Sequence, residues 1–82
     1  MDFRGYSRRV VEANKAASSN NLGVLLGRYC ISRDISAMEI AGYFKVSKMT
    51  IYRWFTGAGE PSLKHTDKIT ELLGRYAEDN LS

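Results

Sequence analysis

The chain has 82 residues, of which 44% are hydrophobic and 26% are charged. This length holds one domain, because most domains occupy about 50 to 250 residues. It predicts a thin core, because a chain of this size buries only about 60% of the surface that it exposes when unfolded. No apolar run approaches the ~18 residues that span a bilayer. The single Cys30 and the single His65 exclude an intrachain disulfide and a zinc site with four protein ligands. We therefore expect a cytoplasmic protein that contacts no membrane and folds by packing alone.

Charge is distributed unevenly along the chain. Twelve Lys and Arg against nine Asp and Glu give a net charge of +3. Residues 1–33 carry +4, residues 34–59 carry +1 and residues 60–82 carry −2. This asymmetry fits a protein that presents its N-terminal and middle parts to a polyanion and turns its C-terminal part away.

Residues 1–19 are basic and have a weak apolar face. Apolar residues such as Val11 allow a short helix, whereas Arg4, Arg8 and Arg9 suit an arm that follows a polyanion. Both interpretations of this segment stay open, a basic N-terminal arm and a marginal helix.

Capping residues mark the starts of three further helices. Asn20 or Asn21 can cap a helix over residues 22–32. Ser36 and Glu39 form a capping box, which predicts a helix from Ala37. Ser47 caps a third helix, which begins at Lys48 and ends where Gly57 and Gly59 interrupt the pattern.

A final amphipathic helix follows Pro61 and Ser62. No segment alternates with the period of two that a strand requires, so we predict no sheet. The apolar stripe of this last helix comprises Leu63, Ile69, Leu72, Leu73, Tyr76 and Ala77.

The stretch from Ile40 to Trp54 resembles the helix-turn-helix of the lambda repressor and Cro family of phage and bacterial regulators. Ala41 stands where the two helices of that motif cross, and Ser47 stands at the cap of the second. The resemblance covers about residues 20–76, and it implies an all-α, lambda-repressor-like DNA-binding domain of four or five helices over residues 20–82. The residues that match the buried positions of the family are Ile40, Phe44, Val46, Ile51 and Trp54.

The sequence departs from the family pattern at three places. Lys45 occupies the turn position that glycine usually holds, and a non-glycine residue in the left-handed region costs roughly 1 kcal/mol or more. Ala37 replaces a frequent glutamine, so the phosphate or base contact of that glutamine is missing or is taken over by Ser36. Residues 1–19 have no counterpart in the minimal pattern and resemble the basic arms of some DNA-binding domains.

The resemblance implies that residues 48–55 lie in the major groove of DNA. Lys48 and Arg53 suit the two acceptors of guanine, and Met49 suits a thymine methyl group. The plainer alternative is that these side chains form only the solvated face of a helix. The expected DNA-contacting residues are Ser36, Ser47, Lys48, Met49, Thr50, Tyr52 and Arg53 of the motif, with Arg4, Arg8 and Arg9 of the N-terminal segment.

An enzyme is not expected. Catalysis needs a base positioned against a nucleophile or a metal, and the chain has no second histidine, no paired-carboxylate motif and no phosphate-binding glycine loop. Cys30 falls on an apolar stripe, where cysteine is usually a small core residue. We expect no catalytic residue, no cofactor and no metal.

These expectations describe a sequence-specific binder of double-stranded DNA. It would be a Cro- or repressor-like transcriptional regulator of phage or mobile-element origin, nucleoid-associated and acting by occupancy of an operator or promoter. A homodimer, with the last helix as its candidate surface, would place two recognition helices ~34 Å apart. Two alternatives stay open: a DNA-binding accessory protein similar to an excisionase, a transposase or a small terminase subunit, and a protein-binding module that targets host RNA polymerase.

Overall fold

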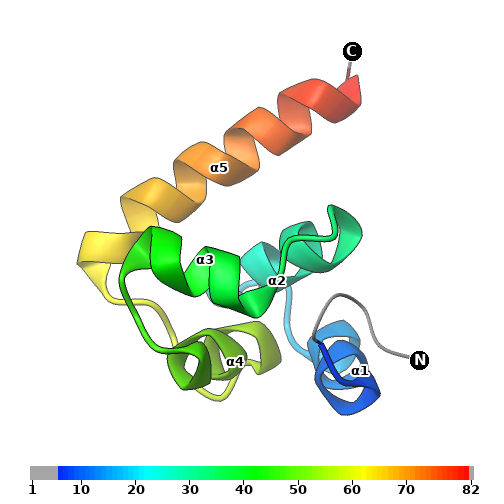
Figure 1. Cartoon of the computed structure of the whole chain (residues 1–82). Coiled ribbons are helices and arrows are strands. Elements are labelled where there is room, and N and C mark those ends of the chain that lie inside the picture. The colour runs from blue at the N-terminus through cyan, green and yellow to red at the C-terminus, as the bar shows by residue number, and fades with distance from the viewer. Residues whose placement is uncertain (1–5, 82) are drawn as a thin grey trace.

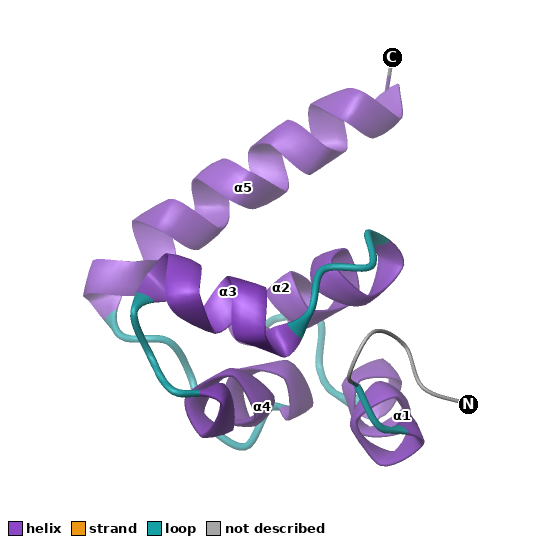
Figure 2. Cartoon of the chain, in the orientation of Figure 1, coloured by secondary structure: helices purple, strands orange, loops and turns teal. Residues whose placement is uncertain are grey.

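A computed structural model describes the backbone of residues 6–81 and the side chains of residues 6–75. These residues form five helices joined by short loops, without a strand (Figures 1 and 2). The prediction of an all-helical chain without a sheet is confirmed for the described residues. The helices are α1 (Arg8–Ala16), α2 (Leu22–Ser32), α3 (Ala37–Phe44), α4 (Lys48–Thr56) and α5 (Leu63–Leu81).

Side-chain caps fix the starts of four helices. The Ser36 hydroxyl accepts from the backbone N–H of Glu39 at 3.1 Å, and the Glu39 carboxylate accepts from the N–H of Ser36 at 3.3 Å, which confirms the capping box. Ser47 accepts from the N–H of Thr50 at 3.2 Å, as expected. Asn21 caps α2, and Ser7 caps α1. A cap accepts from N–H groups that have no partner within the helix, so the capping residues locate the helix starts.

Left-handed residues end α2 and α3. Asp34 has a φ of 62° and Lys45 has a φ of 59°. The N–H after each reaches back to a carbonyl five residues earlier, Ile35 to Cys30 at 2.9 Å and Val46 to Ala41 at 3.0 Å. This is the Schellman motif, which usually employs glycine at the left-handed position. The expected left-handed conformation of Lys45 is confirmed.

The core lies around α2, which packs against both α4 and α5, and α3 packs on α4. The motif residues Ile40, Ala41, Phe44, Ile51 and Trp54 are all buried, and Val46 is half-buried against them. The apolar stripe expected for the last helix is wrong at its first residue. Leu63 is 87% exposed, because it opens α5 before that helix reaches the core at the fully buried Ile69.

Of the two conformations considered for residues 1–19, the structure has a helix from Arg8 to Ala16. It is docked rather than marginal. Val11 is buried, and the amide of the buried Asn14 donates to the carbonyls of Val24 at 3.0 Å and Phe55 at 2.7 Å. Arg28 closes the end of α1 by donating to the carbonyl of Ala17 at 2.9 Å. An extended basic arm is therefore not the conformation of residues 8–16.

Two glycines let α2 approach α4 closely. A Cβ on Gly23 would lie 2.8 Å from the Cβ of Trp54, and one on Gly27 would lie 2.8 Å from Cγ of Phe55. Real Cβ atoms essentially never come this close to such neighbours. The backbone of α2 therefore rests directly on the inner face of α4, and it determines where the outer face of α4 stands.

Candidate nucleic-acid interface

Helices α3 and α4 are joined by the three residues Lys45, Val46 and Ser47. The Schellman turn at Lys45 stops α3, and the Ser47 cap starts α4. On the inner side, the rings of Phe44 and Trp54 pack edge to face with their centroids 5.7 Å apart. Turn, cap and ring contact together hold the two helices in a fixed mutual orientation.

The outer face of α4 carries polar, basic and flexible apolar side chains. Lys48, Met49 and Arg53 are exposed, Met49 to 68%. Ile51 and Phe55 of the same helix are fully buried. Figure 1 shows α4 together with α1 at one end of the molecule, with the C-terminal part of α5 at the other. The outer face of α4 is therefore uncovered within the part of the chain that the structure describes.

Ser47 and Thr50 are engaged with each other at the start of α4. Their hydroxyl oxygens lie 3.1 Å apart, in addition to the capping contact between Ser47 and the Thr50 N–H. Ser47 is exposed and Thr50 is half-buried. A ligand at this helix start therefore meets a hydroxyl pair that is already ordered.

Ser36 is poorly placed for an anion. Its hydroxyl donates to the Glu39 carboxylate at 3.1 Å. That carboxylate would repel a phosphate at the start of α3. This geometry does not support the expectation that Ser36 takes over the phosphate or base contact of the family's glutamine.

Tyr52 is half-buried on the side of α4 that contacts the N-terminal segment. Its ring meets that of Tyr6 edge to face with a centroid separation of 6.5 Å. Tyr6 is fully buried, and its hydroxyl donates to the carbonyl of Ile35 at 2.7 Å. Tyr52 is thereby supported on one side.

Arg53 lies against the loop that follows α4. Gly59 donates its N–H to the carbonyl of Arg53 at 3.1 Å. A Cβ on Gly59 would lie 3.4 Å from both Nε and Nη2 of Arg53, so the guanidinium runs along this glycine. Because Gly59 has no side chain, the guanidinium of Arg53 can lie against its backbone. The sequence pattern did not indicate this contact.

The three arginines of the N-terminal segment that were expected to contact DNA are placed differently in the structure. Arg4 lies outside the described residues. Arg8 and Arg9 are exposed at the start of α1, and Arg8 forms an exposed i, i+4 ion pair with Glu12 at 3.8 Å. Helix α1 packs against α4, and Tyr6 contacts both Tyr52 and Phe55 of α4. The structure thus brings the segment that carries Arg8 and Arg9 next to α4.

The sequence pattern did not reveal two buried polar residues that pack against α4, Tyr6 and Asn14. Both are buried, and both bind main-chain carbonyls far along the chain. A polar residue among the apolar positions of a short helix was the one available signal for Asn14. The aromatic at position 6 stood alone before the helix and gave none.

Cys30 is fully buried. Burial, and secondarily the carboxylate of Glu39, raises the pKa of its thiol to about 12. Because this pKa lies far above neutral pH, Cys30 is a neutral thiol there, and a thiol without its thiolate form is a poor nucleophile. The described residues contain no group of three or more His, Cys, Asp or Glu positioned to hold a metal ion. They also contain no helix long and apolar enough to cross a membrane.

Comparisons with known proteins found no matching family model, no matching curated protein and no matching solved structure.

Proposed function

We propose that the chain binds double-stranded DNA sequence-specifically, with α4 as the recognition helix of a helix-turn-helix. The observation that carries this proposal is the outer face of α4. It presents Lys48, Met49 and Arg53 to solvent, while α2 and α3 pack closely against its inner face. A helix of this diameter fits the major groove of B-DNA.

The side chains on that face suit base edges. Lys48 and Arg53 are donors for O6 and N7 of guanine, and the exposed Met49 can pack on a thymine methyl group. Rigid support favours such readout, because a recognition side chain discriminates only where its backbone is held in place.

Phosphate contacts would flank the base contacts. Thr50 and Tyr52 lie on the sides of α4, and Arg8 and Arg9 start the helix packed beside it. Phosphate contacts set the register of a protein on DNA and make its affinity depend on salt. Together they would extend the footprint beyond α4.

The biological role in this proposal is that of a Cro- or repressor-like transcriptional regulator of phage or mobile-element origin, nucleoid-associated in a bacterial cytoplasm. It would act by occupying an operator or promoter and so excluding or recruiting polymerase. The exposed outer face of α4 supports DNA binding. The resemblance of residues 40–54 to the helix-turn-helix of phage and bacterial regulators supports a role in regulation.

The test is selection of binding sites from a random duplex library, followed by affinity measurement over a salt series. Enrichment of one sequence is expected, with a log affinity that falls linearly with log salt because phosphate contacts release counterions. Lys48→Ala should weaken binding to the selected site by ~1 to 3 kcal/mol.

Arg33→Ala is the matched control, because it removes the same charge from the end of α2, outside the helix-turn-helix. Its effect should be much smaller. A library without enrichment, or an affinity indifferent to salt, would contradict DNA binding and favour a protein partner. A single asymmetric site would favour an excisionase-like accessory role.

A further inference from the structure

Helices α1 and α2 leave an open groove between them. Arg28 of α2 donates from Nη2 to the carbonyls of Asn14 at 3.3 Å and Ala17 at 2.9 Å, and it so holds the end of α1 against α2. Beside this contact the groove has a volume of about 210 Å³. Its walls are formed by Val11, Asn14 and Lys15 of α1 and by Arg28, Ile31 and Ser32 of α2.

The inner surface of this groove is mainly apolar. Val11 is buried and Ile31 is half-buried. The side chain of Asn14 is 1% exposed, and its amide nitrogen already donates to the carbonyls of Val24 and Phe55. An occupant of the groove therefore gains mainly apolar contacts from its inner surface.

The two charged residues that line the groove, Lys15 and Arg28, are both basic. The hydrogen bonds of Arg28 do not compensate its charge, because their acceptors are neutral main-chain carbonyls, all reached from Nη2. A guanidinium has five N–H donors, and these bonds use none of those on Nε and Nη1. The groove thus offers two positive charges to an anion.

The wider surroundings of the groove have the same sign of charge. Helix α1 and residues 28–34 carry five basic and two acidic side chains, a net charge of +3. Of the two acidic residues, Glu12 pairs with Arg8 at 3.8 Å on the surface of α1, and Asp34 directly follows Arg33. Neither acidic residue lines the groove, so the attraction for an anion is not cancelled there.

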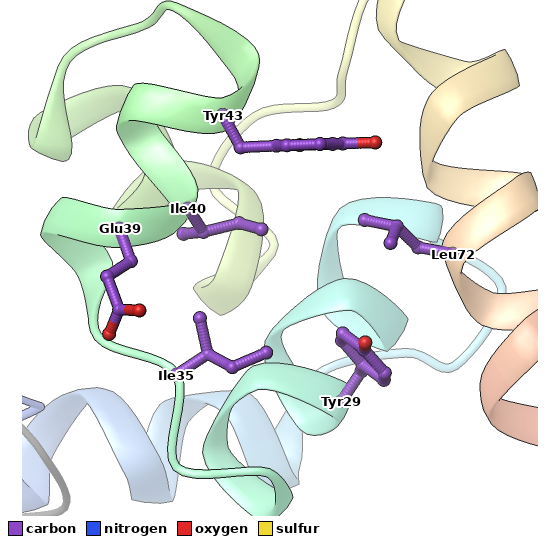
Figure 3. Close-up of a pocket in the computed structure, with 6 residues that line it drawn as sticks. All are labelled: Tyr29, Ile35, Glu39, Ile40, Tyr43 and Leu72. Carbon is purple, nitrogen blue, oxygen red and sulfur yellow. The ribbon is translucent and has the colours of Figure 1, made fainter.

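A second opening provides an internal comparison. It has a similar volume, about 240 Å³, and lies between α3 and α5, where Figure 3 shows its six lining side chains. The one charged residue in this lining is the acidic Glu39. Two openings of similar size and opposite charge should select ligands of opposite charge.

We propose that the groove between α1 and α2 binds a small carboxylate that has an apolar body. The apolar body lies on Val11 and Ile31, and Lys15 and Arg28 bind the carboxylate, which suits the planar donors of a guanidinium. A cavity of about 150 Å³ binds one benzene molecule. The groove therefore has room for an aromatic ring with its carboxylate. This site goes beyond the proposed DNA binding and does not depend on it.

The experiment is titration of the full chain with benzoate at constant ionic strength, followed by NMR of the backbone amides. The shifts should concentrate on the residues of α1 and α2 that line the groove and should leave the opening between α3 and α5 unaffected. Benzamide has nearly the same shape without the charge, and benzylamine has the opposite charge. Each should bind the groove at least about tenfold more weakly than benzoate.

Lys15→Glu reverses one charge of the groove at an exposed position, and it should weaken benzoate binding at least about tenfold. Lys64→Glu is the matched control, since it makes the same reversal at an exposed position of α5 that does not line the groove. Its affinity for benzoate should equal that of the wild type. Arg28 is left unchanged because it also holds the end of α1, and circular dichroism would verify that both variants are folded.

Four results would overturn the proposal: no saturation with benzoate up to about 10 mM, benzamide bound as tightly as benzoate, a Lys15→Glu protein that binds benzoate like the wild type, or a Lys64→Glu protein weakened as much as Lys15→Glu. Selection of DNA sites is measured separately, without benzoate. A chain that binds benzoate in the groove and enriches no duplex would refute DNA binding alone.

Discussion

Among the residues proposed to contact base edges, Arg53 has the surroundings that bear most directly on that proposal. Its guanidinium runs along the bare backbone of Gly59, and its own carbonyl accepts the N–H of that glycine. The loop after α4 thus supports the side chain over its length. A supported guanidinium loses less conformational entropy when it binds two acceptors.

Arg53→Ala should therefore cost ~1 to 3 kcal/mol on the selected DNA site and relax the preference at one base pair. The measurement is a set of binding isotherms on the selected site and on its single-base variants. An equal loss on every sequence would mean that Arg53 touches phosphate and reads no base.

Lys45 is a second informative residue, since it has the left-handed conformation that glycine adopts at low cost. Lys45→Gly removes the steric cost of that conformation and should stabilise the domain by about 0.5 to 1 kcal/mol, after allowance for the greater freedom of glycine in the unfolded chain. Denaturant unfolding of both proteins measures the difference.

Gly57→Ala is the reciprocal control for that prediction. Gly57 ends α4 with a φ of 83°, where an alanine is strained. The two changes should shift the unfolding midpoint in opposite directions. A Lys45→Gly protein less stable than the wild type would mean that the lysine side chain contributes more than its backbone costs.

At the scale of elements, α2 and α4 are separated by no side chain at Gly23 and Gly27. This close approach makes the position of α4 depend on the position of α2. Elsewhere a helical glycine has no such role. A Cβ on Gly42, in α3, would meet nothing within 4 Å.

The two alanine substitutions therefore separate packing from helix propensity. Gly27→Ala brings a Cβ to within 2.5 Å of Nδ2 of Asn14 and 2.8 Å of Cγ of Phe55, and it should destabilise the domain by about 1 to 3 kcal/mol through overpacking. Gly42→Ala should stabilise it by about 0.5 to 1 kcal/mol, since only the propensity changes. Thermal unfolding compares them, and similar effects of the two substitutions would contradict the close contact.

Helix boundaries were predictable from the sequence, because caps and left-handed turns are local. Ser36, Ser47 and Gly57 mark the ends of α3 and α4 by their own chemistry. The docking of α1 was not predictable, since Asn14 binds the carbonyls of Val24 and Phe55, and a carbonyl is the same in every residue type.

The candidate site likewise has features that the sequence predicts and contacts that it does not predict. Periodicity predicts which residues of α4 face outward, because it depends on spacing alone, and Lys48, Met49 and Arg53 are indeed exposed. The course of Arg53 along Gly59 and the support of Tyr52 by Tyr6 depend on how distant segments meet. Those contacts could not be predicted from the sequence pattern, because they join segments that are distant along the chain.

At the scale of the whole molecule, two buried acidic groups make the fold sensitive to alkali. Burial raises the pKa of the Cys30 thiol from 9.0 to about 12, and it raises the pKa of the Tyr6 hydroxyl well above its ordinary value of 10.0. Unfolding exposes both groups and lets them ionise at lower pH. Stability is therefore complete below about pH 9 and declines as the pH rises toward the folded-state values.

Denaturant unfolding between about pH 8 and pH 11 should show this decline, at up to about 1.4 kcal/mol per pH unit for each group that ionises only on unfolding. Cys30→Ala and Tyr6→Phe should each flatten the slope, although each variant starts from a lower stability. A slope unchanged in both variants would assign the alkaline loss to other groups.

The contact between Asn14 and Phe55 also has a consequence for biosynthesis. Translation delivers α1 before α2 and α4, so its buried amide must wait for a carbonyl 41 residues farther along the chain. A helix of nine residues is too short to persist alone in water. Helix α1 should therefore become ordered only after α4 has been made, although it leaves the ribosome before α4 does.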